Sequence, residues 1–403
     1  MHILLIHQAY MGDNEAGGTR HAEFGKYLVQ KGHRFSVIGS TVSYLSGKPV
    51  KRSEDDCETG IDVHRAYTYH ALHKNYFRRA LSFITFMVSS FFIGLRIKDV
   101  DIIWGTSPPL FQGLTAWLLS KIKKAPFIFE VRDLWPAFAV DMGVLNNPLL
   151  IWVAETIERF LYRCADHLLI NSPAYEDHLV QKGASRDQIT LIPNGVDLSI
   201  FSGKENGQWF LEQYILEDKF VIIYAGAHGP ANDLKVVMKA AELLKNHQDI
   251  CFVLVGDGKE KSDLQHQAEA KNLQNVVFIS PQPKSKMPEI LGAADVGLAI
   301  LKDIPMFLKT YPNKVFDYMA AGLPTLLVID GVIREVIEKA EGGLFVPPGN
   351  PEALAHKVLY LSQNENKCRE MGKSAAAFVQ DHFDREEHAK VLEKVFLSLV
   401  DKS

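Results

Sequence analysis

A lysine and an aspartate three residues apart are the most informative chemical groups in this sequence. Lys314 and Asp317 lie in the stretch Tyr311–Pro324, which reads as a helix opened by Pro312 and closed by Gly322, followed by a strand. Residues three apart share one face of a helix, here close to its N-terminus. A lysine there can neutralise a diphosphate leaving group, and a carboxylate can accept hydrogen bonds from two ribose hydroxyls. The alternative is a salt bridge within the helix, worth on the order of tenths of a kcal/mol.

Two glycine-rich turns come earlier in the chain, and each follows a strand-like apolar run. The first contains Gly226, Ala227 and His228 and precedes a helix that begins near Asn232. The second lies one strand later and consists of Gly256, Asp257 and Gly258. Backbone amides in such turns can bind a diphosphate. One turn of this kind is a weak signal, whereas two on neighbouring strands indicate a nucleotide.

A further glycine turn follows the first apolar run of the chain. It contains Gly17, Gly18, Thr19 and Arg20, ahead of a helix that runs to about Lys31. Glycine lets the backbone approach a ligand closely, and the helix N-terminus behind it favours an anion. The turn has neither the GxGxxG pattern nor the Walker lysine, so an ordinary glycine loop is the alternative.

Ionisable residues also end the apolar strand that closes at Val131. Arg132 is a candidate partner for a phosphate or carboxylate, and Asp133 is a candidate to accept a hydroxyl proton from an acceptor. A Trp135-Pro136 turn follows them. The alternative is an Arg–Asp pair that only stabilises the loop.

The elements that position these residues are short apolar runs, each followed by a helical stretch. This alternation predicts parallel sheets covered on both faces, in an α/β chain of two doubly wound, Rossmann-like domains. Since such sheets bind ligands beyond the carboxyl ends of their strands, we expect the domains to face a central cleft. The expected strands are 3–6, 35–39, 101–105, 127–131, 167–170 and 189–192 in the first domain, and 220–225, 252–255, 276–279, 296–300, 325–328 and 344–346 in the second.

The domain boundary is expected near 197–218, where polar residues and glycines collect. We therefore predict an N-terminal domain over 1–197 and a C-terminal domain over 198–384. The last stretch, 385–403, has helical apolar spacing. It is either a surface helix of the second domain or a helix that returns to pack on the first.

Composition excludes several classes of protein. The 403 residues are 47% hydrophobic and carry a net charge of −4, which excludes wholesale disorder and indicates no affinity for nucleic acid. The four cysteines are far apart, so neither a zinc site nor a disulfide framework is indicated. The N-terminus resembles a strand and not a signal peptide, so a cytoplasmic location is expected.

The most apolar segment is 80–95. As a helix of about 16 residues it would measure about 24 Å, which is shorter than the hydrocarbon core of a bilayer. Basic and aromatic residues precede it: Lys74, Tyr76, Phe77, Arg78 and Arg79. The segment 74–95 would suit contact with a membrane surface that carries a lipid-linked acceptor. The alternative is a helix buried fully against the first sheet.

Together these stretches resemble the retaining GT-B glycosyltransferases of family 4 over nearly the whole chain. The stretches that carry the resemblance, in this order, are Gly17–Thr19, Ile192–Asp197, Gly256–Gly258 and Phe316–Pro324. Within the family, Thr106–Pro109 and Val131–Pro136 look like the branch that builds bacterial surface polysaccharides, including amino-sugar transferases of O-antigen and capsule pathways.

The resemblance implies a role for each part of the donor site. Asp317 would hold the ribose, in the place of the second glutamate of the family's E-x7-E motif. Gly226 and Lys314 would face the diphosphate, with Asn313 beside them, and the loop around Gln282 would hold the base.

The reaction implied is transfer of a hexose or an N-acetylated amino sugar, with retention of configuration. The donor would be a nucleotide diphosphate sugar, most simply a UDP-sugar, and the acceptor a polyprenyl-diphosphate-linked saccharide. The leaving phosphate would act as base, and no metal or further cofactor is implied. The enzyme would work at the inner face of the cytoplasmic membrane.

Two departures from the family pattern stand in the donor half. Lys309 occupies the position of the first glutamate of the motif, and no basic residue follows Gly226 before Lys235. Lys314 would then carry more of the diphosphate charge than usual. These departures keep two alternatives open: a sugar-nucleotide epimerase on the same scaffold, and a non-catalytic partner of another transferase.

Overall fold

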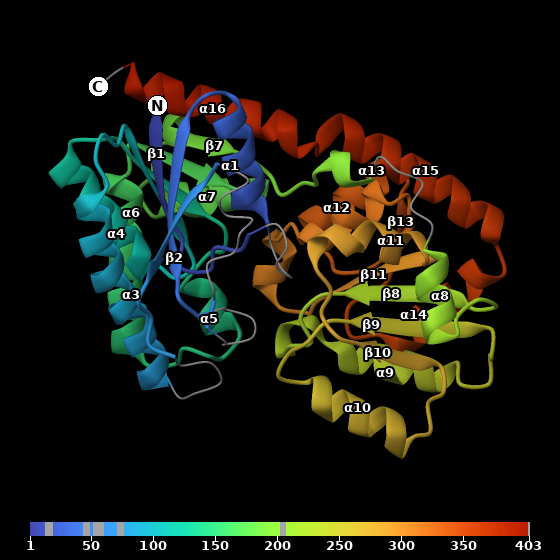
Figure 1. The fold of residues 1–403 in the computed structure, drawn as a ribbon. Coiled ribbons are helices and arrows are strands. Elements are labelled where there is room, and N and C mark those ends of the chain that lie inside the picture. The colour runs from blue at the N-terminus through green and yellow to red at the C-terminus, as the bar shows by residue number, and fades with distance from the viewer. Residues whose placement is uncertain (13–18, 43–48, 51–59, 71–75, 202–206, 402–403) are drawn as a thin grey trace. The chain divides into compact units, whose positions relative to one another are not determined.

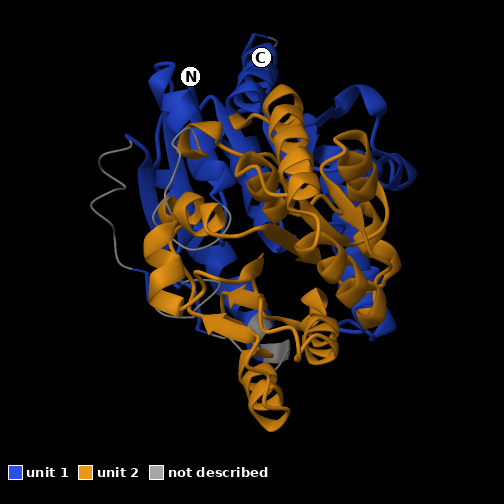
Figure 2. Cartoon of the chain, turned by 90° about the vertical axis from the view of Figure 1, so that its right-hand side faces the viewer, with its two compact units in different colours: residues 1–193, 386–403 blue, residues 194–385 orange. Residues whose placement is uncertain are grey.

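The computed structural model describes residues 1–12, 19–42, 49–50, 60–70, 76–201 and 207–401 (Figure 1). The chain forms two compact units (Figure 2). Unit 1 comprises Met1–Pro193 and Glu386–Ser403, and unit 2 comprises Asn194–Arg385. The predicted pair of doubly wound, parallel-sheet domains is confirmed.

The boundary between the units lies four residues before the expected one. Val196 donates its backbone N–H to Phe383, and its carbonyl accepts from the N–H of Arg385. These hydrogen bonds attach the segment after Pro193 to the end of unit 2. The sequence assigned this segment to the first domain because its turn chemistry is local, whereas its bonding partners come from 190 residues further along the chain.

Unit 1 is built on a seven-stranded parallel sheet in the order β3-β2-β1-β4-β5-β6-β7. Its strands are β1 (His2–Ile6), β2 (Arg34–Ser40), β3 (Asp62–Ala66), β4 (Ile102–Ser107), β5 (Phe127–Val131), β6 (His167–Ile170) and β7 (Ile189–Leu191). Its helices are α1 (Arg20–Gln30), α3 (Tyr76–Arg96), α4 (Phe111–Lys123), α5 (Ala137–Asp141), α6 (Pro148–Cys164), α7 (Glu176–Gln181) and α16 (Arg385–Val400).

Strand β3 was absent from the expected set. It reads Asp-Val-His-Arg-Ala, in which Val63 and Ala66 are buried but three residues apart, so the segment shows neither an apolar run nor an apolar alternation. The strand lies at the edge of the sheet, where polar side chains reach solvent, and its pairing with β2 fixes it in place.

The C-terminal helix α16 belongs to unit 1, as the colours of Figure 2 show. Its apolar side buries Leu392 and Phe396, and the Phe396 ring meets the Trp104 ring of β4 with their centroids 5.5 Å apart. The Glu393 carboxylate accepts a hydrogen bond from the Tyr27 hydroxyl at 2.9 Å. The spacing of apolar residues predicted an amphipathic helix, and this sheet supplies its partner.

Unit 2 has a six-stranded parallel sheet in the order β10-β9-β8-β11-β12-β13. Its strands are β8 (Phe220–Ala225), β9 (Ile250–Val255), β10 (Val276–Ile279), β11 (Val296–Ile300), β12 (Thr325–Val328) and β13 (Gly343–Phe345). Its helices are α8 (Gln208–Tyr214), α9 (Leu234–Leu243), α10 (Lys261–Ala270), α11 (Met287–Gly292), α12 (Asn313–Ala320), α13 (Val332–Lys339), α14 (Pro351–Ser362) and α15 (Glu365–His382).

The strand orders locate the candidate sites. In each sheet the direction of chain progression reverses once, between β1 and β4 in unit 1 and between β8 and β11 in unit 2. Ligands of open α/β sheets bind beyond the carboxyl ends of the strands at such a reversal. The glycine turn after β8 and the polar residues after β1 therefore lie where this fold binds ligands, and those after β5 lie at the same sheet edge, one strand beyond β4.

Candidate functional site

The two glycine turns of unit 2 pack directly on one another. A Cβ atom on Gly256 would lie 1.9 Å from the carbonyl oxygen of Gly226, and one on Gly258 would lie 2.5 Å from that of His228. The His228 N–H donates to the Asp257 carbonyl at 2.8 Å. Neither glycine tolerates a side chain, so the turns after β8 and β9 form one continuous stretch of backbone.

His228 lies beneath these turns with its ring fully buried. Burial, assisted by the charges of Lys261 and Lys314, lowers its pKa to about 4, so the imidazole is neutral at pH 7. Neither ring nitrogen has a hydrogen-bond partner in the described part of the chain. Lys261 is differently placed, because its ammonium donates to the carbonyls of Gly256 and Ile279 at 2.7 and 3.1 Å.

Lys314, in the first turn of α12, places its ammonium at the end of β8. The Nζ atom is buried and has no hydrogen-bond partner among the described residues. It lies 3.7 Å from the centroid of the Tyr224 ring, and a Cβ atom on Gly226 would lie 2.9 Å from it. Burial lowers the pKa of Lys314 to about 7. A buried cation without a counterion beside a glycine turn is suited to an anionic ligand.

Asp317 does not pair with Lys314. Its Oδ1 atom accepts a hydrogen bond from the Lys284 ammonium at 2.5 Å, and both side chains are mostly buried. Lys284 begins the short helix Lys284–Lys286 after β10, directly beyond Gln282. The salt bridge within α12 that competed with the ligand interpretation is therefore not formed.

Two further residues of the predicted donor set are Asn313 and Gln282. Asn313 begins α12, and its buried Oδ1 atom has no partner in the described residues. Gln282 donates within its own loop, to the Ser280 carbonyl at 3.2 Å. The structure thus brings Asn313, Lys314 and Asp317 together through α12, and Lys284 links α12 to the loop that holds Gln282. Lys284 was absent from the predicted set, because an isolated loop lysine carries no sequence signal.

Unit 1 contains a buried ion cluster at the end of β5. The Glu130 carboxylate accepts from Arg20 Nε at 2.9 Å and lies 2.6 Å from His21 Nε2, and all three side chains are buried. Burial alone would raise the pKa of Glu130, but His21 and Arg20 hold it well below its usual range. Arg20 also donates to the carbonyls of Ile192 and Pro193 at 2.6 and 2.7 Å. These bonds give Arg20 a structural role, and a ligand contact for it stays a prediction.

Arg132 and Asp133 follow directly after strand β5. Arg132 Nη1 lies 3.1 Å from His7 Nε2, and no ion pair joins Arg132 to Asp133 in the described structure. Burial, with the charges of His21 and Arg132, places the pKa of His7 well below 6.5. The imidazole is therefore neutral and accepts from the guanidinium.

Several groups at this edge of the sheet remain unsatisfied. Arg132 Nε, His7 Nδ1 and Ser107 Oγ are buried without a partner among the described residues. Burial raises the pKa of Asp133 to about 6, against the opposing effect of Arg132. His7 was not predicted, because a histidine at a strand end has no distinguishing pattern.

The first glycine turn is only partly described. Gly17 and Gly18 lie outside the described residues. Thr19 precedes α1 and its hydroxyl donates to the Glu23 carboxylate. No group of three or more His, Cys, Asp or Glu side chains in the described ranges could hold a metal ion.

Comparison with protein families matches both halves of the chain. Residues 16–195 match the glycosyl transferase 4-like domain, and residues 208–378 match the glycosyl transferases group 1. The chain is a GT-B glycosyltransferase of the family 4-like group. This confirms the resemblance found in the motifs, and the enzyme class with it.

Relatives among known proteins are distant but cover much of the chain. A glycosyl transferase of Escherichia coli (strain K12) named for colanic acid biosynthesis, WcaI, is 24% identical over 92% of this chain and 95% of its own. An N,N'-diacetylbacillosaminyl-diphospho-undecaprenol alpha-1,3-N-acetylgalactosaminyltransferase of Campylobacter jejuni is 21% identical over 81% of this chain and 84% of its own.

Solved structures show the same fold at lower identity. HepE of Anabaena, solved with UDP-glucose, has a TM-score of 0.75 at 16% identity and covers 99% of this chain and 100% of its own. Sucrose-phosphate synthase of Thermosynechococcus elongatus has a TM-score of 0.78 at 19% identity, with both chains covered completely.

Proposed function

We propose that unit 2 of this glycosyltransferase binds a nucleotide diphosphate sugar, a UDP-sugar in the first instance. The carrying observation is the buried Lys314 ammonium, which has no hydrogen-bond partner among the described residues and lies beside Gly226. A diphosphate would supply the missing counterion and accept hydrogen bonds from the backbone of the two glycine turns. HepE, a structural neighbour, was solved with UDP-glucose, which supports this choice of donor.

In this proposal the other residues of the predicted donor site in unit 2 hold the nucleoside. The carboxylate of Asp317 accepts ribose hydroxyls, and Lys284 positions it through the 2.5 Å contact. The loop at Gln282 faces the base, and Asn313 supplies a buried acceptor next to the diphosphate lysine. Lys309 replaces the family's first glutamate, so the donor sugar is recognised without that carboxylate.

The proposed acceptor is a lipid-linked saccharide of cell-surface polysaccharide synthesis, held by unit 1. Two relatives support this choice, because one is named for colanic acid and the other for a diphospho-undecaprenol acceptor. Arg132, whose Nε lacks a partner in the described structure, meets the acceptor phosphate. Asp133 orients the acceptor hydroxyl when ionised, and Gly17–Arg20 is the loop proposed to approach the diphosphate.

The proposed chemistry is transfer with retention of configuration. The acceptor oxygen bonds to the anomeric carbon as the bond to the diphosphate oxygen breaks on the same face. The hydroxyl proton passes to the leaving phosphate, so no separate base is consumed. Lys314 stabilises the charge that develops on the diphosphate, which is where electrostatic catalysis is most effective.

The test is thermal stabilisation by UDP-, GDP-, ADP- and TDP-sugars, in the native sequence and in Lys314→Met and Asp317→Ala. A ligand that binds only the folded state raises the melting temperature. We expect a selective shift with a UDP-sugar that both variants reduce. The matched control is Lys235→Met, because Lys235 pairs at the surface with Glu260. An unchanged shift in Lys314→Met, or no shift with any nucleotide, would contradict the donor site.

Turnover then separates the remaining alternatives. An epimerase would convert the identified donor without any acceptor, whereas a non-catalytic partner would bind the donor and transfer nothing to lipid-linked saccharides. For a transferase, we expect product only when both substrates are present. We also expect kcat/KM to fall below about pH 6 as Asp133 takes up a proton. Asp133→Asn should lose this fall together with about a hundredfold in rate, because the acceptor hydroxyl is no longer oriented.

A further inference from the structure

Helix α3 exposes a continuous apolar stripe. The stripe consists of Leu81, Ile84, Val88, Phe92 and Leu95, with exposed fractions between 36% and 57%. At about 100° per residue, these five positions fall within an arc of about 80°. The opposite side of the helix buries Phe86 and Ser90, and Gly94 allows a close approach to Leu119 of α4. The helix is therefore only half covered by unit 1, and the alternative of a fully buried helix is wrong.

Neighbouring elements extend this stripe into a surface. Ser89 of α3 donates to the Tyr67 carbonyl at 2.6 Å, which places the backbone of Tyr67 beside the helix, and the Tyr67 side chain is exposed. Helix α4 packs along α3 and exposes Leu118 and Ile122. We name these eight residues the α3 surface: Tyr67, Leu81, Ile84, Val88, Phe92, Leu95, Leu118 and Ile122. A contiguous apolar surface of this kind on a single chain marks an interaction site.

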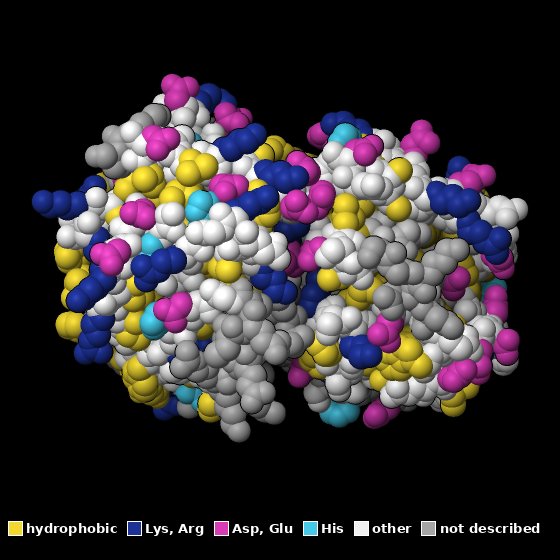
Figure 3. All heavy atoms as spheres, turned by 45° about the horizontal axis from the view of Figure 1, so that its top comes forward, with side chains coloured by type: hydrophobic (Ala, Val, Ile, Leu, Met, Phe, Trp, Pro, Cys, Tyr) yellow, Lys and Arg dark blue, Asp and Glu magenta, His cyan; other side chains and the backbone are white. Residues whose placement is uncertain are grey.

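The charged residues of α3 and α4 are all basic. Neither α3 nor α4 contains an aspartate or glutamate, although acidic residues outnumber basic ones in the whole chain. Arg96 ends α3, and Lys121 and Lys123 lie in the last turn of α4. Figure 3 shows hydrophobic side chains lying next to Lys and Arg side chains along the margin of unit 1.

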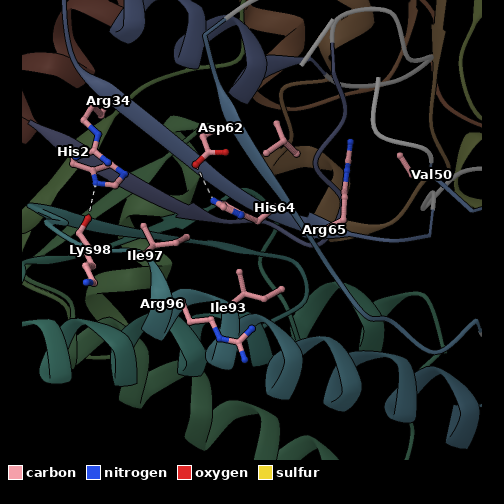
Figure 4. A pocket seen from close by; sticks show the side chains of 11 residues that line it. His2, Arg34, Val50, Asp62, His64, Arg65, Ile93, Arg96, Ile97 and Lys98 are labelled. Carbon is pink, nitrogen blue, oxygen red and sulfur yellow. Dashed lines mark hydrogen bonds and ion pairs between the residues drawn. The ribbon is translucent and has the colours of Figure 1, made fainter. Parts of the chain in front are cut away.

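A basic hollow adjoins the C-terminal end of α3 (Figure 4). Arg34, Arg96 and Lys98 line it, and none of the three forms an ion pair within the described residues. The acidic residues nearby either have a hydrogen-bond partner or lie outside the lining of the hollow. Asp62 lies 2.9 Å from His64, Asp101 accepts the His2 N–H, and Asp99 is exposed outside the lining.

We propose that the α3 surface docks on an anionic lipid bilayer, with α3 parallel to the membrane plane. The five apolar side chains of α3 enter the interface, and Arg34, Arg96 and Lys98 meet lipid phosphates. None of the described helices combines the length and apolarity that a membrane span requires. The contact expected at 74–95 rested on basic residues at the start of this helix, whereas these cations lie at its other end. Lys74 of the expected set lies outside the described residues.

The same charges disfavour a second copy of the chain as the occupant. An isologous contact through this surface would bring identical cations together, since no acid of α3 or α4 is present to pair with them. Anionic lipid removes that repulsion. The inference rests on unit 1 alone and is independent of the donor proposed for unit 2, although it deepens the proposal of a lipid-linked acceptor.

The test is co-sedimentation with vesicles of phosphatidylcholine alone and with equal parts of phosphatidylglycerol. The variants are Val88→Glu with Phe92→Glu, and Arg96→Glu with Lys98→Glu. Leu243→Glu is the matched control, because it places the same charge on an exposed leucine of a unit 2 helix. Nucleotide thermal shift and circular dichroism establish that each variant is folded.

We expect the native protein to sediment with the anionic vesicles and the control to match it. The apolar variant should lose about tenfold or more in binding to anionic vesicles. The charge variant should lose its preference for phosphatidylglycerol, and added salt should weaken native binding. Native protein that stays in the supernatant would overturn the proposal. So would an apolar variant that binds like the native protein, or one whose only change is loss of a dimer.

Discussion

Both units bury charged side chains at the carboxyl ends of their sheets. The buried charge of Glu130 in unit 1 has partners, whereas that of Lys314 in unit 2 has no hydrogen-bond partner among the described residues. In unit 1 the Glu130 carboxylate has Arg20 and His21 as partners, and Arg20 also reaches two backbone carbonyls. In unit 2 the Lys314 ammonium has no hydrogen bond in the described structure, and burial lowers its pKa to about 7. A buried charge with complete partners supports the fold, whereas one without partners lowers stability unless a ligand completes it. Burial alone therefore does not identify a binding residue.

The largest expected effect comes from breaking the satisfied cluster. Glu130→Ala leaves the Arg20 guanidinium buried without its carboxylate, which should cost about 3–5 kcal/mol in the free energy of unfolding. Urea unfolding measures the loss. The control is Glu155→Ala, since that carboxylate pairs with Arg159 and Lys182 at the surface and should cost at most about 1 kcal/mol. Equal losses in the free energy of unfolding for the two variants would contradict the stabilising role of the buried Glu130 cluster.

The next effect tests the unsatisfied cation. Lys314→Met should weaken UDP binding by about 1.5–3 kcal/mol, which is the range for a hydrogen bond to a charged group. The free energy of unfolding without ligand should stay the same or rise, because a buried charge without partners is removed. Titration calorimetry and urea unfolding measure the two quantities. A large loss of stability would instead make Lys314 a structural residue like Arg20.

The protonation of Lys314 offers a second test that its buried ammonium lacks a partner. The pKa of Lys314 lies near 7 in the folded chain, against an ordinary value of 10.5, so the unfolded chain binds more protons between these values. Stability should therefore rise with pH across this window, and Lys314→Met should flatten the rise. A bound diphosphate raises the pKa again, so UDP binding near pH 8 should take up close to one proton. Calorimetry in buffers of different ionisation enthalpy measures this uptake, which should be absent in the variant.

The smallest effect concerns the contact between Lys284 and Asp317. Both side chains are mostly buried, but the pair retains some contact with solvent. Lys284→Met should change the free energy of unfolding by about 1 kcal/mol or less. Affinity should fall a few-fold for UDP and stay unchanged for inorganic diphosphate, because Lys284 positions the proposed ribose ligand and not the phosphate ligand. Equal losses for both ligands would place Lys284 at the diphosphate instead.

The expected strands were found where they are apolar throughout. Parallel strands covered on both faces need continuous apolar runs, and 127–131 and 296–300 show them clearly. Strand β3 was missed because an edge strand tolerates Asp62 and Arg65. Helix α3 proved longer than expected, from Tyr76 to Arg96, because polar residues at its ends continue the helix without continuing the apolar run.

By itself, the sequence determined the fold class, the enzyme class and the turns at which ligands are expected. These properties follow from local signals: the periodicity of apolar residues, glycines in turns that follow strand-like runs, and the order of the motifs along the chain. Tertiary structure decided which ionisable groups are satisfied. Arg20 and Lys314 look alike as basic residues near a helix start, yet Arg20 pairs with Glu130 across 110 residues, whereas Lys314 lies over the Tyr224 ring without a hydrogen-bond partner among the described residues. The energy of a buried charge depends on partners brought together by folding, and these partners are not adjacent in the chain.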